Sequence, residues 1–130
     1  MAVGFNVTQP RVDPNVIATQ LVAALQAQEG SGVEFVAFYD TQTGSVRLLG
    51  LSGQAVPDKD FELWYIKGDE APVSMGVIPV DGRTEIPMGD AAKQKFSEGT
   101  VLAVTLEAKG GSPTGAPQGP IVAAGAATVI

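Results

Sequence analysis

The sequence predicts a mainly β protein, an antiparallel β-sandwich of about seven short strands with one N-terminal α-helix. Two observations lead to this fold class. Beyond Gly32, hydrophobic residues alternate with a period of two in one short run after another. Turn-forming residues separate these runs, since glycine and proline supply 16 and 9 of the 130 residues.

The chain is expected to consist of an extended arm over residues 1–12 and a single domain over residues 13–130. Within this domain, residues 13–30 are expected to form an amphipathic helix, and residues 33–126 the strands. Asp13 and Pro14 are typical of an N-cap and a first helical position. Five residues then follow at helical spacing: Ile17, Leu21, Ala24, Leu25 and Gln28.

The strands are predicted from alternating runs at residues 33–39, 45–51, 61–67, 73–80, 84–86, 100–108 and 121–126. A hairpin loop at residues 40–44 joins the first two of these strands. A short helix over residues 89–98, with Phe96 facing inward, is expected before the strand at 100–108. A long loop rich in glycine and proline, residues 109–120, leads to the last strand.

Composition excludes several classes of chemistry. The chain contains no histidine and no cysteine, so a Ser-His-Asp triad, a Cys-His nucleophile and zinc sites built on these residues cannot form. Disulfides are excluded for the same reason. The 14 acidic residues against 8 basic ones give a net charge of −6, which argues against nucleic acid as a partner.

Asp58, Asp60 and Glu62 have the spacing of a cation loop. A calcium-binding loop would require glycine at its sixth position, which is Leu63 within an apparent strand. A solvated loop is the better interpretation. Asp69 and Glu70 lie in a predicted turn, where acidic residues are common for backbone reasons. A hydrolase built on paired carboxylates is therefore a weak alternative.

The glycine-rich segment Gly110–Gly115 lacks the Gly-Lys-Ser/Thr ending of a phosphate-binding loop. Trp64, Tyr65 and Tyr39 are candidates for an aromatic platform that binds sugars, although Trp64 and Tyr65 point to opposite faces of one strand. Met75 and Met88 have no histidine or cysteine to complete a copper site. We therefore predict no catalytic, cofactor-binding or metal-binding residues, no cofactor, and no enzymatic activity.

Two long stretches together resemble a known family. They are FELWYIKGDEAPVSMGVIPVDGRTEIPM, which begins at Phe61, and TVLAVTLEAKGGSPTGAPQGPIVAAG, which begins at Thr100. Both resemble the C-terminal extracytoplasmic domain of the anti-sigma-K factor family (RskA type). The matching features include Glu62-Leu63-Trp64 in a strand and the loop from Gly110 to Pro120. The resemblance is strong over residues 61–126 and loose over residues 13–60.

The resemblance implies a regulatory domain without catalytic residues. Members of this family are single-pass membrane proteins, in which a cytoplasmic domain restrains an extracytoplasmic-function sigma factor until stepwise proteolysis releases it. The chain would then lie outside the plasma membrane, in the periplasmic or extracytoplasmic space. The sigma factor would be contacted only by the cytoplasmic domain, which this chain lacks together with the transmembrane helix.

The expected partners are envelope proteins or proteases, with a second copy of the chain as a further option. The alternative function is an envelope module that binds a small ligand or a carbohydrate through a β-sandwich. No signal peptide is visible at the start. The longest uncharged apolar stretch, residues 121–130, is too short to span a bilayer.

Overall fold

The computed structural model describes residues 20–40 and 42–129, which form nine strands and one short helix. The elements are β1 (Leu21–Ala27), β2 (Glu34–Asp40), β3 (Ser45–Ser52), β4 (Lys59–Ile66), β5 (Val73–Ile78), β6 (Gly82–Pro87), α2 (Asp90–Lys95), β7 (Val101–Ala108), β8 (Ile121–Ala126) and β9 (Thr128–Val129).

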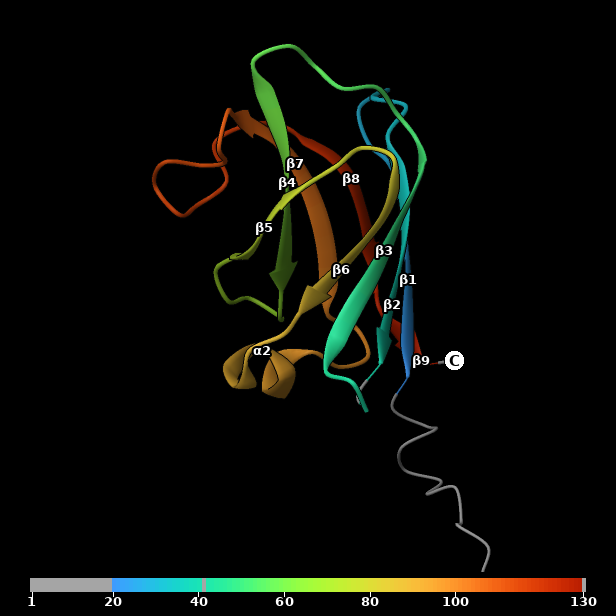
Figure 1. The fold of residues 1–130 in the computed structure, drawn as a ribbon. Helices are drawn as coiled ribbons and strands as arrows, with labels where there is room; N and C mark the ends of the chain where they lie inside the picture. Colours follow the sequence, from blue (N-terminus) through green and yellow to red (C-terminus); the bar gives the residue numbers. More distant parts are fainter. Residues whose placement is uncertain (1–19, 41, 130) are drawn as a thin grey trace, which may run out of the picture.

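All strand pairs are antiparallel, and the strand order is β5-β4-β7-β8-β1-β2-β3-β6, with β9 beside β1 (Figure 1). The sheet folds over so that its two halves enclose the core, and β1 belongs to both halves. It pairs with β2 through Leu21–Leu25 and with β8 through Gln26 and Ala27. The sandwich is therefore a nearly closed sheet, with β5 and β6 as the end strands of the described path.

The core lies between the two halves and is built from the inward-facing residues of alternating strands. In β2, Phe35, Ala37 and Tyr39 are buried while Phe38 is exposed. In β4, Phe61, Leu63 and Tyr65 belong to the same core cluster. At the end of the molecule that carries α2, Phe96 closes the core by packing against Tyr39, with ring centroids 4.8 Å apart.

Most sequence predictions for the fold are confirmed. The chain is mainly antiparallel β, and the seven predicted strands correspond to β2 through β8. The hairpin between β2 and β3, the short helix before β7 and the buried Phe96 are also present. The prediction did not include β9.

The predicted N-terminal helix is wrong where it can be compared with the structure. Residues 21–27 form strand β1, and residues 20 and 28–30 are not helical either. Residues 13–19 lie outside the described residues together with the arm at 1–12. The spacing of Leu21 and Leu25 explains the error, because a separation of four places two side chains on one face of a helix and also on one face of a strand. Ala23 lies between them and is buried as well, which is the period of a strand.

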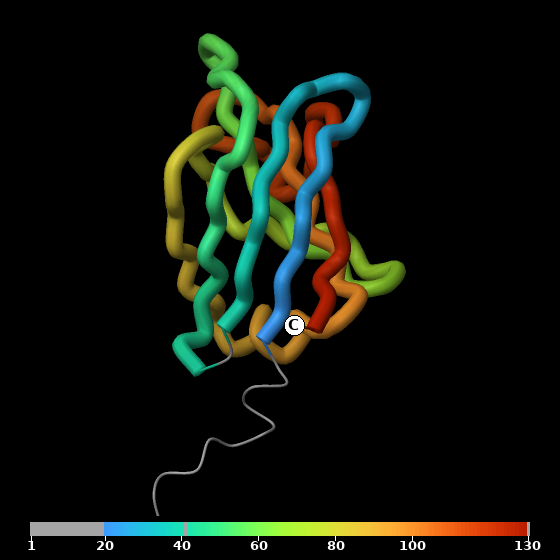
Figure 2. Tube along the Cα trace, turned by 90° about the vertical axis from the view of Figure 1, so that its right-hand side faces the viewer, coloured from blue at the N-terminus to red at the C-terminus, as the bar shows by residue number. Residues whose placement is uncertain are grey.

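Pairing with distant strands overrides the local helix signal of this alanine-rich segment. Figure 2 shows β1 lying between β2 and the C-terminal strands. Leu21 is opposite Tyr39 of β2 and Val129 of β9, so both sides of the segment find backbone partners that a helix would not use.

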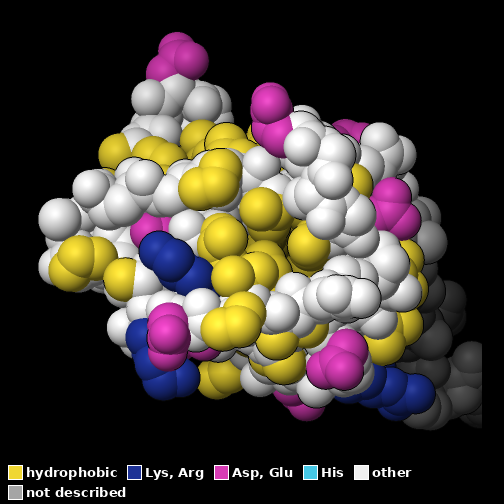
Figure 3. Space-filling model, turned by 90° about the horizontal axis from the view of Figure 1, so that it is seen from above, with side chains coloured by type: hydrophobic (Ala, Val, Ile, Leu, Met, Phe, Trp, Pro, Cys, Tyr) yellow, Lys and Arg dark blue, Asp and Glu magenta, His cyan; other side chains and the backbone are white. Residues whose placement is uncertain are grey.

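At the end of the molecule opposite α2, three connections meet. A side-chain carbon at Gly53, just after β3, would lie 2.8 Å from Cγ2 of Val80 in the β5–β6 turn. The same position would be 3.1 Å from Cγ2 of Val33, which follows the β1–β2 turn. Seen from this end, hydrophobic side chains gather in the middle and polar or charged side chains surround them (Figure 3).

Candidate functional site

Three carboxylates lie on the outer face of strands β4 and β7, away from the main core. Asp60 is opposite Glu107 across the two strands, and Glu62 is opposite Thr105. Glu62 and Glu107 are buried, which is unusual for carboxylates unless hydrogen bonds satisfy their charge. The loop at residues 109–120 supplies many of these bonds.

Glu107 lies in a chain of hydrogen bonds that begins at the only tryptophan of the protein. The indole Nε1–H of Trp64 donates to Oγ1 of Thr105 at 2.8 Å, and the Thr105 hydroxyl donates to Oε2 of Glu107 at 2.5 Å. The backbone N–H of Gln118 donates to the same oxygen at 3.1 Å, and that of Gly119 at 3.3 Å. The carboxylate therefore receives donors from both a strand and the returning loop.

Glu62 and Asp60 hold the other end of the same loop. Oε1 of Glu62 accepts a hydrogen bond from the backbone N–H of Ser112 at 2.7 Å, while Oε2 accepts one from the hydroxyl of Ser74 in β5. Oδ2 of Asp60 accepts from the backbone N–H of Gly110 at 2.8 Å. Hydrogen bonds to charged acceptors are stronger than neutral ones, so the carboxylates fix the loop firmly.

These contacts overturn one interpretation made from the sequence, the solvated loop, and agree with another, the rejection of a phosphate-binding loop. Asp60 and Glu62 are not part of a solvated loop, because they lie in β4 and hold the segment after β7. The glycine-rich segment Gly110–Gly115 already donates two of its backbone N–H groups to these carboxylates. Bound anions use such N–H groups, so their engagement by carboxylates argues against a phosphate-binding loop here.

The proposed aromatic platform is contradicted by the structure. Trp64 is 0% exposed, and Tyr65 and Tyr39 are also buried, so none of the three rings presents a face to a sugar. Trp64 does point away from Tyr65, as expected for neighbours on a strand. It lies on the face of the sheet next to the loop at residues 109–120, and this face is covered as well. Burial raises the pKa of the Tyr39 phenol, and the neighbouring Asp40 carboxylate raises it further.

The remaining candidate residues, Glu70, Met75 and Met88, make contacts that serve the fold. Glu70 in the β4–β5 turn accepts a hydrogen bond from the Lys95 ammonium, and this bond raises the pKa of Lys95. Met88 belongs to the hydrophobic core, and Met75 packs against it. Within residues 20–40 and 42–129, no group of three or more Asp or Glu side chains is placed to hold a metal ion.

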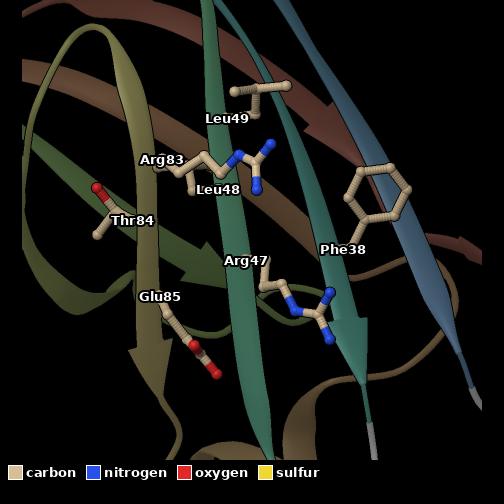
Figure 4. Close-up of a pocket in the computed structure, with 7 residues that line it drawn as sticks. All are labelled: Phe38, Arg47, Leu48, Leu49, Arg83, Thr84 and Glu85. Carbon is tan, nitrogen blue, oxygen red and sulfur yellow. The ribbon is translucent and has the colours of Figure 1, made fainter.

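A groove of about 490 Å³ lies on the outer face of β2, β3 and β6. Its lining residues are Phe38, Arg47, Leu48, Leu49, Arg83, Thr84 and Glu85 (Figure 4). Arg47 is opposite Glu85 across β3 and β6, and Leu49 is opposite Arg83, so the two arginines are diagonal neighbours on one face. Leu48 and Thr84 alternate with these residues and belong to the inner face.

Sequence analysis did not identify this groove. It could place Arg47 on the same strand face as Leu49, but Arg83 lies in a strand that is 36 residues away along the chain. The two arginines come together only through the pairing of β3 with β6. The local signal available was the exposed face of β3, where charged and large apolar side chains alternate with buried ones.

Within the described part of the chain, no helix has the length and apolar character needed to cross a membrane. Searches for similar proteins found no match among curated proteins and none among solved structures.

A family model described as the C-terminal part of the anti-sigma-K factor RskA matches residues 2–121. The match includes the Glu62-Leu63-Trp64 strand, the β7 strand with Glu107 and the loop that these carboxylates hold. It spans most of the 130 residues. The chain therefore belongs to the family of RskA C-terminal domains of anti-sigma factors.

Proposed function

We propose that this chain is the extracytoplasmic regulatory domain of a single-pass membrane anti-sigma factor. In this proposal another part of the parent protein holds an extracytoplasmic-function sigma factor in the cytoplasm. The domain controls proteolysis of the parent, and proteolysis releases the sigma factor. The observation that carries the proposal is the family match over residues 2–121.

The end at which the chain enters the described fold determines which loops a tethered domain would present. The described fold begins next to α2 and the end of β9, at one end of the molecule (Figure 1). The loops 28–33 and 53–58 lie at the opposite end. A tether on the N-terminal side would therefore present these loops away from the membrane, where envelope partners can reach them.

The position of β1 links the tether to the stability of the domain. β1 is the first described strand, and it pairs on both sides, with β2 and with β8 and β9. A protease that needs an extended substrate would have to remove this strand from the sheet before it could cut there. Folding of the domain thereby protects the segment nearest to the proposed membrane anchor.

Because these 130 residues contain no cysteine, an introduced cysteine is the one thiol within the domain, and its labelling above that of the unmodified parent tests topology. In the full-length parent protein, Asp69→Cys places a thiol in the exposed β4–β5 turn, and Ala123→Cys places one in the core. We expect a membrane-impermeant maleimide to label the first variant in intact cells. The second should be labelled only after denaturation. Labelling of Asp69→Cys only after the cells are lysed would contradict the proposed location.

The regulatory role is tested with a reporter gene that depends on the sigma factor. Deleting residues 20–129 from the parent should change reporter activity and the amount of processed parent, because the domain no longer controls the protease. The control is Glu98→Gln, a substitution at an exposed residue. Unchanged processing after the deletion would refute regulation by this domain.

The second function considered, a ligand-binding β-module, is favoured by one observation, the groove between β2, β3 and β6. A carbohydrate platform made by Trp64, Tyr65 and Tyr39 is not retained, because these rings are buried.

A further inference from the structure

The groove on β2, β3 and β6 combines exposed apolar side chains with two arginines. Phe38 is 45% exposed and Leu49 is 36% exposed, values that are high for large hydrophobic residues. A lone exposed apolar side chain needs no explanation, but these two line the same groove. The volume of about 490 Å³ is in the range of small-molecule sites, roughly 300–1,000 Å³.

The two guanidinium groups are poorly neutralised. The side chain of Arg47 is 66% exposed, and its contact with Oδ2 of Asp40 is 4.0 Å long. Arg83 has no carboxylate within 4.0 Å among residues 20–40 and 42–129. In Figure 4 the guanidinium group of Arg83 extends over β3 beside Leu49, and that of Arg47 extends over β2 toward Phe38.

Glu85 is in the groove but is engaged elsewhere. Its Oε2 accepts a hydrogen bond from the hydroxyl of Ser45 at 2.8 Å, at the end of β3 nearer to α2. Figure 4 shows its carboxylate below both guanidinium groups. The opposite strand position therefore does not supply the counterion that Arg47 would take if the face were a simple network of salt bridges.

We propose that this groove binds a soluble amphipathic anion, a carboxylate or phosphate monoester carried on an acyl chain or an aromatic ring. The planar guanidinium group can form two parallel hydrogen bonds with a pair of oxygens of either a carboxylate or a phosphate. The anionic group would lie between Arg47 and Arg83, and the apolar body would cover Phe38 and Leu49. The site goes beyond the proposed regulatory function, because binding to the purified chain does not depend on it.

The net charge of the chain favours binding of an anion at this groove rather than elsewhere on the protein. With a net charge of −6, the chain as a whole repels anions at long range. Three arginines occur in the sequence, and two of them line this groove. Because the groove is small and partly apolar, we favour a compact amphiphile over an acidic polymer.

The test titrates the 15N-labelled full chain with decanoate, below the concentration at which it forms micelles, and follows backbone NMR signals. Decanol tests the apolar part alone, and acetate and inorganic phosphate test the anion alone. We expect saturable shifts in β2, β3 and β6 with decanoate, and at least about tenfold weaker binding of the three other probes.

Variants identify the residues. Arg83→Gln and Arg47→Gln should each raise the Kd for decanoate about tenfold, and Phe38→Ala should raise it by several-fold. Lys109→Gln, which removes an exposed positive charge outside the groove lining, should leave the Kd unchanged. Thermal unfolding of each variant shows whether the fold is retained.

Several results would overturn the proposal. Decanol binding as tightly as decanoate would show that the arginines do not recognise the anion, and phosphate binding as tightly would show that the apolar part is not used. Shifts that map to another face would place the site elsewhere. Binding of an acidic peptide or of phosphatidylglycerol vesicles to this face, without decanoate binding, would assign it to a macromolecule or a membrane.

Discussion

The indole N–H of Trp64 in β4 donates a hydrogen bond to the side-chain oxygen of Thr105 in β7, and this hydroxyl in turn donates to the buried carboxylate of Glu107. The threonine therefore satisfies two groups that are out of contact with water. Trp64 is fully buried but does not belong to the main core cluster, so its hydrogen bond positions the ring on the outer side of the sheet.

Thr105→Val keeps the shape of the side chain but removes its hydroxyl. We expect the free energy of unfolding to fall by about 1–3 kcal/mol, because the Trp64 N–H loses its acceptor and Glu107 loses one donor. Urea denaturation followed by tryptophan fluorescence measures the change. The same substitution at exposed Thr128 is the matched control, and an equal effect of the two substitutions would contradict the role of the network.

Glu107→Gln tests how the carboxylate holds the loop at residues 109–120. The neutral amide keeps the size of the side chain but loses charge-assisted bonds from Thr105, Gln118 and Gly119. We expect a loss of about 1–3 kcal/mol in unfolding free energy and faster hydrogen exchange at the amides of Gln118 and Gly119.

The control for Glu107→Gln is Glu98→Gln, an exposed position with little expected effect. Unchanged exchange at Gln118 and Gly119 in Glu107→Gln would show that the loop does not depend on this carboxylate.

Gly125→Ala should destabilise the contact between β8 and β1. An added Cβ would lie 2.0 Å from the carbonyl oxygen of Ala24, a backbone atom that cannot move without displacing the strand. Overpacking of this kind costs typically 1–3 kcal/mol, which thermal or urea unfolding will detect. Gly89→Ala is the control, because its Cβ meets no atom within 4 Å. Equal stability of the two variants would argue against this close approach.

Alkaline pH should destabilise the protein through Tyr39. Burial raises the pKa of its phenol above the ordinary value of 10.0, so the folded state keeps the proton after the unfolded state has lost it. The associated stability is complete below about pH 10 and is lost as the pH rises through the higher pKa of the folded state.

Tyr39→Phe isolates this effect because it retains the ring that packs against Phe96. We expect the unfolding free energy of this variant to fall less than that of the wild type between about pH 8 and pH 11. The ion pair of Lys95 with Glu70 weakens in the same range in both proteins and cancels in the comparison. Parallel pH profiles would exclude Tyr39 as the titrating group.

Removal of β1 should prevent folding although the other strands remain. A chain that begins at residue 29 leaves β2 and β8 without their shared partner, and we expect it to lack dispersed NMR signals. A synthetic peptide of residues 20–28 should restore the folded spectrum by pairing with both strands. The peptide carrying L21S and L25S, which loses two core side chains, should not restore it. A folded spectrum without any peptide would refute the central role of β1.

Local patterns were sufficient to predict most strands but not how they meet. The alternation in β2 and β4 identifies their buried faces. Phe35 and Leu63 each lie on the apolar face of their own strand, and this face packs into the core whatever the neighbouring strand is. β1 was mistaken for a helix because Leu21 and Leu25 satisfy both periods. The segment pairs with β2 on one side and, on the other, with β8 and β9, which are more than 90 residues away along the chain. The groove was missed for a similar reason, because Arg83 reaches Arg47 only across paired strands.

The place of β1 at the centre of the sheet also determines when the protein can finish folding. Its partners β8 and β9 follow the other described strands in the sequence, so the two halves of the sheet cannot join until β8 has been synthesised. Contacts between such distant segments slow folding and leave strand edges open in the meantime. A nascent chain that stops before residue 121 therefore exposes one edge of β7, and this edge is a site for aggregation or for chaperone binding.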